Sequence, residues 1–527
     1  MLLKRLAGLV RLTALITLPA AANLFGGDWP MWRYDPGRTA ASPEELPESL
    51  HPAWVRSFGA RQPVWDDPLN RDLMPYDRVF EPVVGEGRMF IGFNDSDKLV
   101  ALDAGSGEEL WRFYAGGPVR LPPVFWQGAV YFVSDDGCLY CLEADSGSLR
   151  WKFRGGPSNR LVIGNERLIS TWPARGGPVI ADGVVYFTAS IWPFMGTFIY
   201  ALDAATGEVV WENDRTGSQY MLQPHDSPAF AGIAPQGALT ASGEGLLVPG
   251  GRSVPAFFER RTGDQRYYHL ADQNKTGGSF VCAAGRVFFN HYRDQVCSMY
   301  DLDTGLPLVQ KIGMRPVPAG EAFYFGGKTV RAYDAKRLQQ KARWTVDGDF
   351  IDRWLAGLDT KKVRPEFPRN FLRRWIERKS SAWRKSLLWE IEADAAGDLI
   401  RSGSRLYAAG KDGITAIALG EEPQVAWCQP VEGGVERLLA ADSRLFAVTL
   451  DGRIMAFSSG PEPQTAKPQG NELCLPDSPA ETRASEIIRS TGVGQGWALV
   501  CGVEDGALLE ALVHNSGLCV VARGDIE

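Results

Sequence analysis

The sequence predicts an all-β fold, an eight-bladed β-propeller with four-stranded blades, followed by a small incomplete α/β, Rossmann-like segment. Three observations lead to this prediction. A unit of about 40 residues recurs along most of the chain, most copies place an aromatic residue after a glycine turn, and short alternating apolar stretches precede the copies. The 58 glycines and 34 prolines among 527 residues indicate many turns.

The repeated unit is clearest in three copies that follow one another. They are Ala101–Trp111, Cys141–Trp151 and Ala201–Trp211, and in each a glycine stands four residues before the tryptophan. Gly107 and Gly147 are 40 residues apart, which is the period of a four-stranded propeller blade. The remaining, weaker copies end near Tyr267, Val309, Trp344 and Trp427, and the last lies at Leu439–Phe457.

The chemistry of the unit explains its residues. Its Asp-x-x-Ser/Thr-Gly stretch predicts a hairpin turn, in which glycine supplies the positive φ and the polar side chains bind backbone N–H groups. The tryptophan follows on the outer strand, where it covers its neighbour. Because so small a sheet is not stable alone, the blades close into a ring. The segment around Trp54 supplies the outer strand of the last blade; seven blades is the competing count.

These repeats resemble the pyrroloquinoline-quinone-like (BamB-like) β-propellers, whose motif is Ala-x-Asp-x-x-Thr-Gly-x-x-x-Trp, over roughly residues 28–460. The resemblance implies either a quinoprotein dehydrogenase or a non-catalytic scaffold. The dehydrogenases need calcium, an Asp base, a stacking Trp and usually adjacent cysteines. No Cys-Cys pair occurs here, and most Asp residues sit at repeat turns. We therefore expect no bound pyrroloquinoline quinone, no metal site and no catalytic residues.

Charge and residue counts exclude other classes. The net charge of −7 argues against nucleic-acid binding, which needs a basic face. Eight cysteines are too few for a disulfide scaffold. Cys138 and Cys141 are three residues apart on an alternating strand, where they face opposite sides and cannot share a metal ion. The five histidines form no metal-binding motif.

Residues 1–22 have the charged start, apolar stretch and small-residue end of a secretory signal peptide, although Arg11 interrupts the apolar stretch. The alternatives are an uncleaved amphipathic anchor and an ordinary core segment. The first cysteine is Cys138, so a cysteine at the new N-terminus is not available for lipid attachment. We expect an exported protein of the periplasm or cell envelope that is not lipid-anchored.

Four long insertions in adjacent blades emerge on one face of the disc. They are rich in Arg, Trp and amide groups, which predicts a site there for an anionic or hydroxylated ligand such as a glycan or peptide. The alternative is that they only cover the mouth of the channel. The insertions are Arg154–Gly177, Ser190–Thr197, Glu212–Gln236 and Pro249–Pro255. The predicted rim residues are Arg160, Arg167, Trp172, Arg175, Trp192, His225, Gln236 and Arg252.

Residues 346–392 form a further insertion. Between Lys361 and Lys385 there are ten Lys or Arg residues against two Glu, and the apolar residues fall near helical spacing. The pattern indicates a basic amphipathic helix over 361–385. Such a helix packs on its own protein, or lies as a peripheral contact on an anionic membrane surface.

The C-terminal region begins with a proline-rich linker, residues 461–479. Residues 480–527 then show the order helix, strand, glycine turn, helix and strand. This segment resembles the opening of class I S-adenosylmethionine-dependent methyltransferases. The resemblance implies cofactor contacts from Gly502, Gly506 and Asp525, although Glu504 replaces the middle glycine of that motif. Two parallel strands and one helix do not complete such a domain, so we expect a truncated segment without activity.

Taken together, the sequence predicts an exported, monomeric, non-catalytic propeller that binds a protein or glycan ligand on one face and does not bind nucleic acid. The alternative is a propeller–methyltransferase fusion truncated before its catalytic half, with S-adenosylmethionine as cofactor only in a complete domain. A quinoprotein dehydrogenase is the third interpretation.

Overall fold

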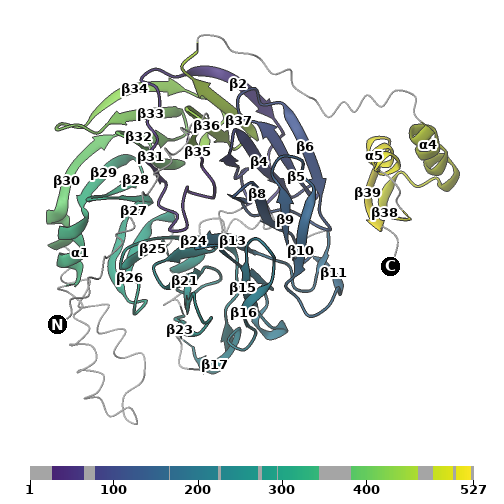
Figure 1. Ribbon diagram of the computed structural model, residues 1–527, viewed down its shortest axis with the longest axis horizontal. Coiled ribbons are helices and arrows are strands. Elements are labelled where there is room, and N and C mark those ends of the chain that lie inside the picture. The colour runs from purple at the N-terminus through teal and green to yellow at the C-terminus, as the bar shows by residue number, and fades with distance from the viewer. Residues whose placement is uncertain are drawn as a thin grey trace, which may run out of the picture.

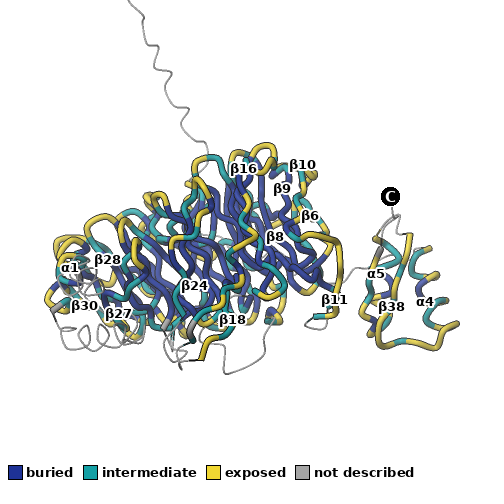
Figure 2. Tube along the Cα trace, turned by 90° about the horizontal axis from the view of Figure 1, so that it is seen from below, coloured by how far each residue is buried: buried dark blue, intermediate teal, exposed yellow. Residues whose placement is uncertain are grey.

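The computed structural model describes residues 27–63, 77–164, 167–223, 227–270, 276–292, 295–343, 382–460, 479–502 and 506–523. Most of the described chain forms short antiparallel strands, so the prediction of a mainly β fold is confirmed. Figure 1 shows the sheets standing side by side around a central axis, and Figure 2 shows the same disc from its edge, with buried strands inside. In the three sheets that carry the clearest repeats, the first two strands are buried and the fourth is partly exposed.

The first two sheets of the ring each have four strands in chain order. One consists of β3 (Val83–Gly85), β4 (Arg88–Phe93), β5 (Lys98–Asp103) and β6 (Glu109–Tyr114). The next consists of β7 (Val124–Trp126), β8 (Ala129–Val133), β9 (Cys138–Glu143) and β10 (Leu149–Arg154).

Two more sheets follow, each accompanied by a separate hairpin. The first contains β13 (Gly176–Ala181), β14 (Val184–Ala189), β15 (Phe198–Asp203) and β16 (Val209–Asn213), with β19 (Gly237–Ala238) parallel to β13. The second contains β20 (Thr240–Ser242), β21 (Gly245–Val248), β22 (Ala256–Glu259) and β23 (Gln265–Tyr267). The hairpins are β11 (Leu161–Gly164) with β12 (Arg167–Ser170), and β17 (Ser218–Leu222) with β18 (Pro228–Gly232). Between β14 and β15 lies the short helix η1 (Pro193–Met195).

A seven-stranded sheet comes next because one long strand belongs to two neighbouring units. Strand β27 (Pro307–Ala319) pairs with β26 through its first part and with β28 through its second. The other strands are β24 (Thr276–Ala284), β25 (Val287–Tyr292), β26 (Cys297–Asp301), β28 (Ala322–Gly326), β29 (Thr329–Asp334) and β30 (Leu387–Glu392). Helices α1 (Ala335–Arg343) and η4 (Ala382–Ser386) lie between β29 and β30 in the chain.

The last two sheets use strands from near the N-terminus. One contains β31 (Asp398–Ser402), β32 (Arg405–Ala409), β33 (Gly413–Ala418) and β34 (Gln424–Pro430), with β1 (Ala41–Ser42) parallel to β31. The other contains β35 (Val435–Ala441), β36 (Arg444–Thr449), β37 (Arg453–Ser458) and β2 (His51–Ser57). Strand β2 pairs antiparallel with β37, which confirms the prediction that the Trp54 segment supplies this outer strand.

The tryptophan repeat has the same register from sheet to sheet. Ala101 lies opposite Trp111, Ala201 lies opposite Trp211, and Ala456 of β37 lies opposite Trp54 of β2. The indole then reaches the turn of the next sheet. Trp54 Nε1 donates to Ala104 O at 3.0 Å, and Trp111 Nε1 donates to Ala144 O at 3.0 Å. Each aromatic residue therefore links two consecutive sheets.

The turns have the chemistry that the repeat predicts. Asp103 Oδ1 accepts from the backbone N–H of Ser106 at 2.7 Å, and Asp203 Oδ1 accepts from that of Thr206 at 2.9 Å. Gly107 has φ +74° and lies against the indole of Trp54, so that a Cβ there would be 2.8 Å from the ring. Glycine at this position thus serves both the turn and the contact with the neighbouring sheet.

The structure corrects one copy of the repeat and the boundary of one insertion. The sequence analysis ended this copy near Trp344 and assigned residues 346–392 to an insertion. In the structure the outer strand is β30, residues 387–392. Trp389 lies opposite Ala332, which is the register that Trp111 and Ala101 have in the first sheet. The repeat is split here by α1 and the residues that follow, so spacing alone did not reveal the strand. Trp344 and most of the predicted 361–385 helix lie outside the described residues.

The core lies between neighbouring sheets, and a segment from the N-terminal part of the chain crosses the middle of the ring (Figure 1). Arg38 in this segment is fully buried and donates to Leu239 O and Pro178 O, both at 2.9 Å. Arg33 reaches the opposite side, where it donates to Pro316 O at 2.6 Å and pairs with Asp398 at 2.9 Å. The segment therefore joins the inner strands of several sheets.

The C-terminal residues form helix α4 (Pro479–Thr491), strand β38 (Gln495–Cys501), helix α5 (Ala507–His514) and strand β39 (Gly517–Arg523). This is the predicted order of elements, and β38 and β39 pair in parallel. Linker residues 461–478 and signal residues 1–22 lie outside the described residues. Among the helices that the structure describes, none is long and apolar enough to cross a bilayer.

Candidate functional site

The predicted rim residues do not converge on one site. Arg175 is fully buried, and its guanidinium holds both carboxylate oxygens of Asp135 at 2.9 Å. Trp172 and Gln236 are also buried. Arg167 forms an ion pair with Asp97, with 2.6 Å between Nη2 and Oδ1.

Three other predicted rim residues, Arg160, Trp192 and Arg252, are exposed. His225 lies outside the described residues. The prediction therefore mixed residues that stabilise the fold with residues that face solvent.

Large apolar side chains are exposed on three of these insertions, which follow one another in the chain. We call six of them, each at least 48% exposed, the aromatic rim. Ile163, Phe194 and Phe230 are 79%, 72% and 73% exposed. Tyr220 and Phe230 stand opposite each other on β17 and β18, with ring centroids 5.1 Å apart. The aromatic rim consists of Leu161, Ile163, Trp192, Phe194, Tyr220 and Phe230.

Specific contacts hold the three insertions together. Trp172 Nε1 donates to Met195 O at 2.8 Å, which ties the segment after β12 to η1. Thr197 Oγ1 donates to Ile233 O at 2.9 Å, which ties η1 to the end of the β17–β18 hairpin. Figure 2 shows β11 and β18 on the same side of the disc. These two hydrogen bonds therefore fix the insertions of the rim relative to one another. Trp172 serves the fold here, because its indole makes one of the two bonds.

Sequence analysis did not identify Phe194, Tyr220 and Phe230. A usable signal was present in the alternation of residues 218–222 and 228–232, which is typical of a hairpin with one aromatic side. Arg160 and Arg252 are the exposed arginines among the predicted rim residues, and Arg215 of the Glu212–Gln236 insertion is exposed as well. Arg215 lies 3.6 Å from Asp214.

A second candidate site is a cluster of buried ion pairs on the axis of the ring. Asp77 accepts from Arg61 at 2.8 Å and from Arg120 at 2.7 Å. Arg120 also pairs with Asp135 at 2.7 Å, and Asp135 continues to Arg175. These side chains come from different sheets and connecting loops, so no regular spacing in the sequence groups them.

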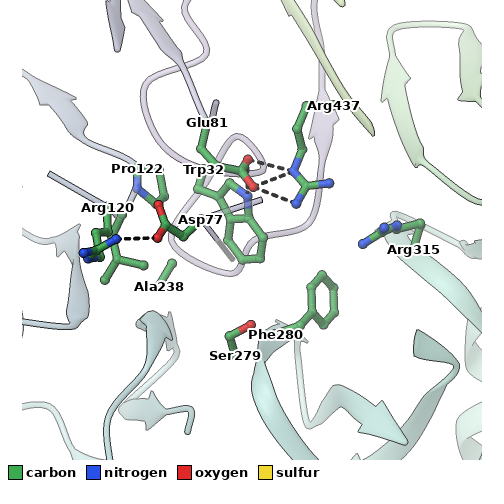
Figure 3. Close-up of a pocket in the computed structure, with 11 residues that line it drawn as sticks. Trp32, Asp77, Glu81, Arg120, Pro122, Ala238, Ser279, Phe280, Arg315 and Arg437 are labelled. Carbon is green, nitrogen blue, oxygen red and sulfur yellow. Dashed lines mark hydrogen bonds and ion pairs between the residues drawn. The ribbon is translucent and has the colours of Figure 1, made fainter. Parts of the chain in front are cut away.

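The same cluster continues on the other side of the axis. Glu81 accepts from Arg437 Nη2 at 2.6 Å and from Trp32 Nε1 at 3.0 Å. A small cavity of about 20 Å³, partly open to solvent, lies between the two groups. Figure 3 shows the guanidinium of Arg315 pointing into this space, with Arg437 above it and Phe280 below. Its walls are Trp32, Asp77, Glu81, Arg120, Leu121, Pro122, Ala238, Ser279, Phe280, Arg315 and Arg437.

Burial and pairing shift the pKa values of the central groups. Burial raises the pKa of Asp135, but Arg175 and Arg120 outweigh it and hold this pKa below the usual value. Burial lowers the pKa of Arg315, and the nearby Arg437 lowers it further. Burial also lowers the pKa of Arg38 to about 9.

The central residues do not fit a calcium–quinone pair. Calcium prefers several carboxylate and amide oxygens that converge on one point. Here Asp77 and Glu81 are each engaged by guanidinium groups, and the remaining polar groups of the cavity wall are mainly cationic. Within the described ranges, no three His, Cys, Asp or Glu residues are grouped closely enough to hold a metal ion.

Comparison with known proteins identifies the family. A model described as outer membrane protein assembly factor BamB matches residues 52–171 and 137–346, which together exceed half of the chain. The chain belongs to this BamB family. The prediction of a pyrroloquinoline-quinone-like, BamB-like repeat protein is confirmed to that extent.

Relatives of this BamB-family chain carry different names. It is 31% identical over 189 residues to an alcohol dehydrogenase (quinone), dehydrogenase subunit, of Komagataeibacter europaeus, covering 32% of this chain and 24% of that protein. It is 27% identical over 162 residues to BamB of Moranella endobia (strain PCIT), covering 29% and 36%. The chain therefore spans only about a quarter to a third of the length of these curated relatives. A solved europium-containing methanol dehydrogenase has a TM-score of 0.49 at 13% identity, covering 82% of this chain and 98% of that one.

The predicted cofactor residues of the C-terminal segment are only partly described. Gly502 follows β38 with φ +71°, and Gly506 is the N-cap of α5. Asp525 lies outside the described residues.

Proposed function

We propose that this chain is an exported, non-catalytic scaffold of the cell envelope that binds a protein partner through the aromatic rim. The observation that carries the proposal is the rim itself. Six large apolar side chains are exposed on three insertions that hydrogen bonds hold in place. Exposed apolar patches on a soluble protein mark interaction surfaces, and aromatic residues are enriched in them. The exposed arginines of the same insertions favour a partner with acidic residues beside its apolar surface.

The scaffold is proposed to have eight blades. In this count the seven-stranded sheet forms two blades that share β27, and β2 completes the blade of β35, β36 and β37. The long strand β27 supports the division because its two parts pair with different neighbours. The C-terminal β38–α5–β39 unit is proposed as a Rossmann-like segment, supported by its parallel strands.

Photo-crosslinking tests the rim. A photoreactive phenylalanine analogue is placed at Phe194 of the full chain, and at Leu388 as a control; Leu388 is an exposed residue of β30, outside the three insertions. We expect a discrete crosslinked protein in envelope extract from position 194 only. Phe230→Ser should weaken this product at least tenfold, because it removes the neighbouring aromatic contact, without changing the melting temperature. Equal products from positions 194 and 388, or none from 194, would refute a protein partner. Retention on a glycan array that depends on Trp192 would instead assign a sugar ligand.

A quinoprotein dehydrogenase is the second candidate, favoured by the names of the relatives. Reconstitution with pyrroloquinoline quinone and calcium tests it. We expect no bound near-UV or visible chromophore after gel filtration, because the cavity presents guanidinium groups where calcium would need free oxygens. A chromophore in proportion to protein would make the dehydrogenase interpretation the better one.

A further inference from the structure

The wall of the central cavity carries more positive than negative side chains. Three arginines line it, Arg120, Arg315 and Arg437, against two carboxylates, Asp77 and Glu81. Asp77 is saturated by Arg61, Arg120 and the amide of Asn94, which donates to it at 2.6 Å.

Glu81 is likewise engaged, because it forms a bidentate pair with Arg437 and accepts from Trp32 Nε1. Both carboxylates of the wall are therefore already paired with groups other than Arg315.

Of the three arginines in the cavity wall, Arg315 has the least negative charge close to its guanidinium. Its side chain is only 5% exposed. It donates to Ala396 O at 3.3 Å and to Gln295 Oε1 at 3.1 Å, which are both neutral acceptors. The nearest carboxylate is Glu436 at 3.6 Å, which is partly exposed and also lies 4.0 Å from Arg437. A buried guanidinium whose ion pair is this long is poorly compensated, because burial removes its hydration.

The cavity has the other features of a small anion site. Arg315 and Arg437 approach it from two different strands, β27 and β35, so an anion between them would meet cations on two sides. Phe280 and Trp32 form an apolar part of the wall, where their rings pack edge to face with centroids 5.6 Å apart. Ser279 lines the lower edge of the same space, beside Phe280, and offers a hydroxyl (Figure 3). Guanidinium groups bind carboxylate and phosphate oxygens in forked geometry.

We propose that this cavity binds one small oxyanion, a phosphate or the carboxylate of a small acid, between Arg315 and Arg437. The anion supplies the negative charge that Arg315 lacks and links β27 to β35 across the axis. The site is independent of the aromatic rim, since none of its residues belongs to the three insertions. Binding therefore stabilises the ring whether or not the rim binds a partner.

Thermal unfolding and calorimetry of the full chain test the proposal. Sodium phosphate and sodium acetate are titrated in separate arms at constant ionic strength, with sodium chloride making up the difference. We expect a saturable rise in melting temperature with at least one oxyanion, and a matching heat of binding. Arg315→Gln should weaken this binding at least tenfold. In anion-free buffer the same variant should melt no lower than the parent protein, because it removes an undercompensated buried charge.

Two further variants keep the test decisive. Arg260→Gln is the matched control, because Arg260 pairs with Asp182 and does not line the cavity. It should bind like the parent. Ser279→Glu places a carboxylate in the cavity and should abolish the response to added anion; this variant decides the matter if Arg315→Gln fails to fold. No saturable response, a response equal to that of chloride, or unchanged binding by both cavity variants would overturn the proposal.

Discussion

Closure of the ring by Trp54 allows a quantitative prediction. Its indole is 1% exposed, lies against Gly107, and donates to Ala104 O at 3.0 Å. Burying a tryptophan removes about 150–250 Å² from water, and at about 25 cal/mol per Å² this is worth at most about 4–6 kcal/mol. Measured truncations of buried Phe or Trp to Ala cost about 3–5 kcal/mol. We therefore expect Trp54→Ala to lower the free energy of unfolding by about 3–5 kcal/mol.

A matched pair of milder variants separates the hydrogen bond from the packing. Trp427 occupies the equivalent register position opposite Ala416, but its Nε1 is buried without an acceptor among the described residues. Changing either indole to phenyl removes similar volume, whereas only Trp54→Phe also breaks a hydrogen bond. Trp54→Phe should therefore cost about 1 kcal/mol more than Trp427→Phe.

Urea unfolding followed by far-UV circular dichroism measures these differences for the full chain. The slope of the transition serves as a control, since it should stay constant if the same surface is exposed on unfolding. If Trp54→Ala costs less than about 1 kcal/mol, the indole does not join the two ends of the ring and the closure argument fails. Equal losses for the two phenyl variants would show that the bond to Ala104 O contributes nothing.

The other predictions concern a glycine turn and the partly buried carboxylate of Asp97. In the same unfolding assay, Gly107→Ala should destabilise the protein by at least about 2 kcal/mol and Gly128→Ala by only about 1 kcal/mol. Both glycines have positive φ, but only at Gly107 would the new Cβ lie 2.8 Å from an indole. Equal losses would show that the contact with Trp54 is unimportant. Burial raises the pKa of Asp97 to about 6, although Arg167 opposes the shift. The folded protein therefore holds this proton more tightly than the unfolded chain, and the contribution to stability is lost as the pH rises from about 4 through about 6. Asp97→Asn removes this dependence, so its melting temperature relative to the parent should be higher at pH 7.5 than at pH 4.5; a difference independent of pH would contradict the shift.

Local sequence patterns were sufficient to predict the repeated unit. The turn at Asp103–Gly107, the strand pair before it and the tryptophan after it are all set by interactions within about ten residues, and the structure confirms them. The role of the Trp54 segment in the last sheet was also predictable, because the final repeat lacked its own outer strand. Cys138 and Cys141 were expected to face opposite sides of β9, and they belong to different hydrophobic clusters. Period-two alternation determines such facing regardless of the rest of the fold.

Only the tertiary structure decided which side chains meet at the axis and which remain on the surface. Arg175 looked like a rim residue in the sequence, yet it is fully buried against Asp135, forty residues away. Arg315 and Glu81 line one cavity although more than two hundred residues separate them. Local patterns record the partners within one sheet, whereas the charge balance on the axis depends on how the whole ring closes. That closure brings inner strands from distant parts of the chain together, and no spacing in the sequence encodes it.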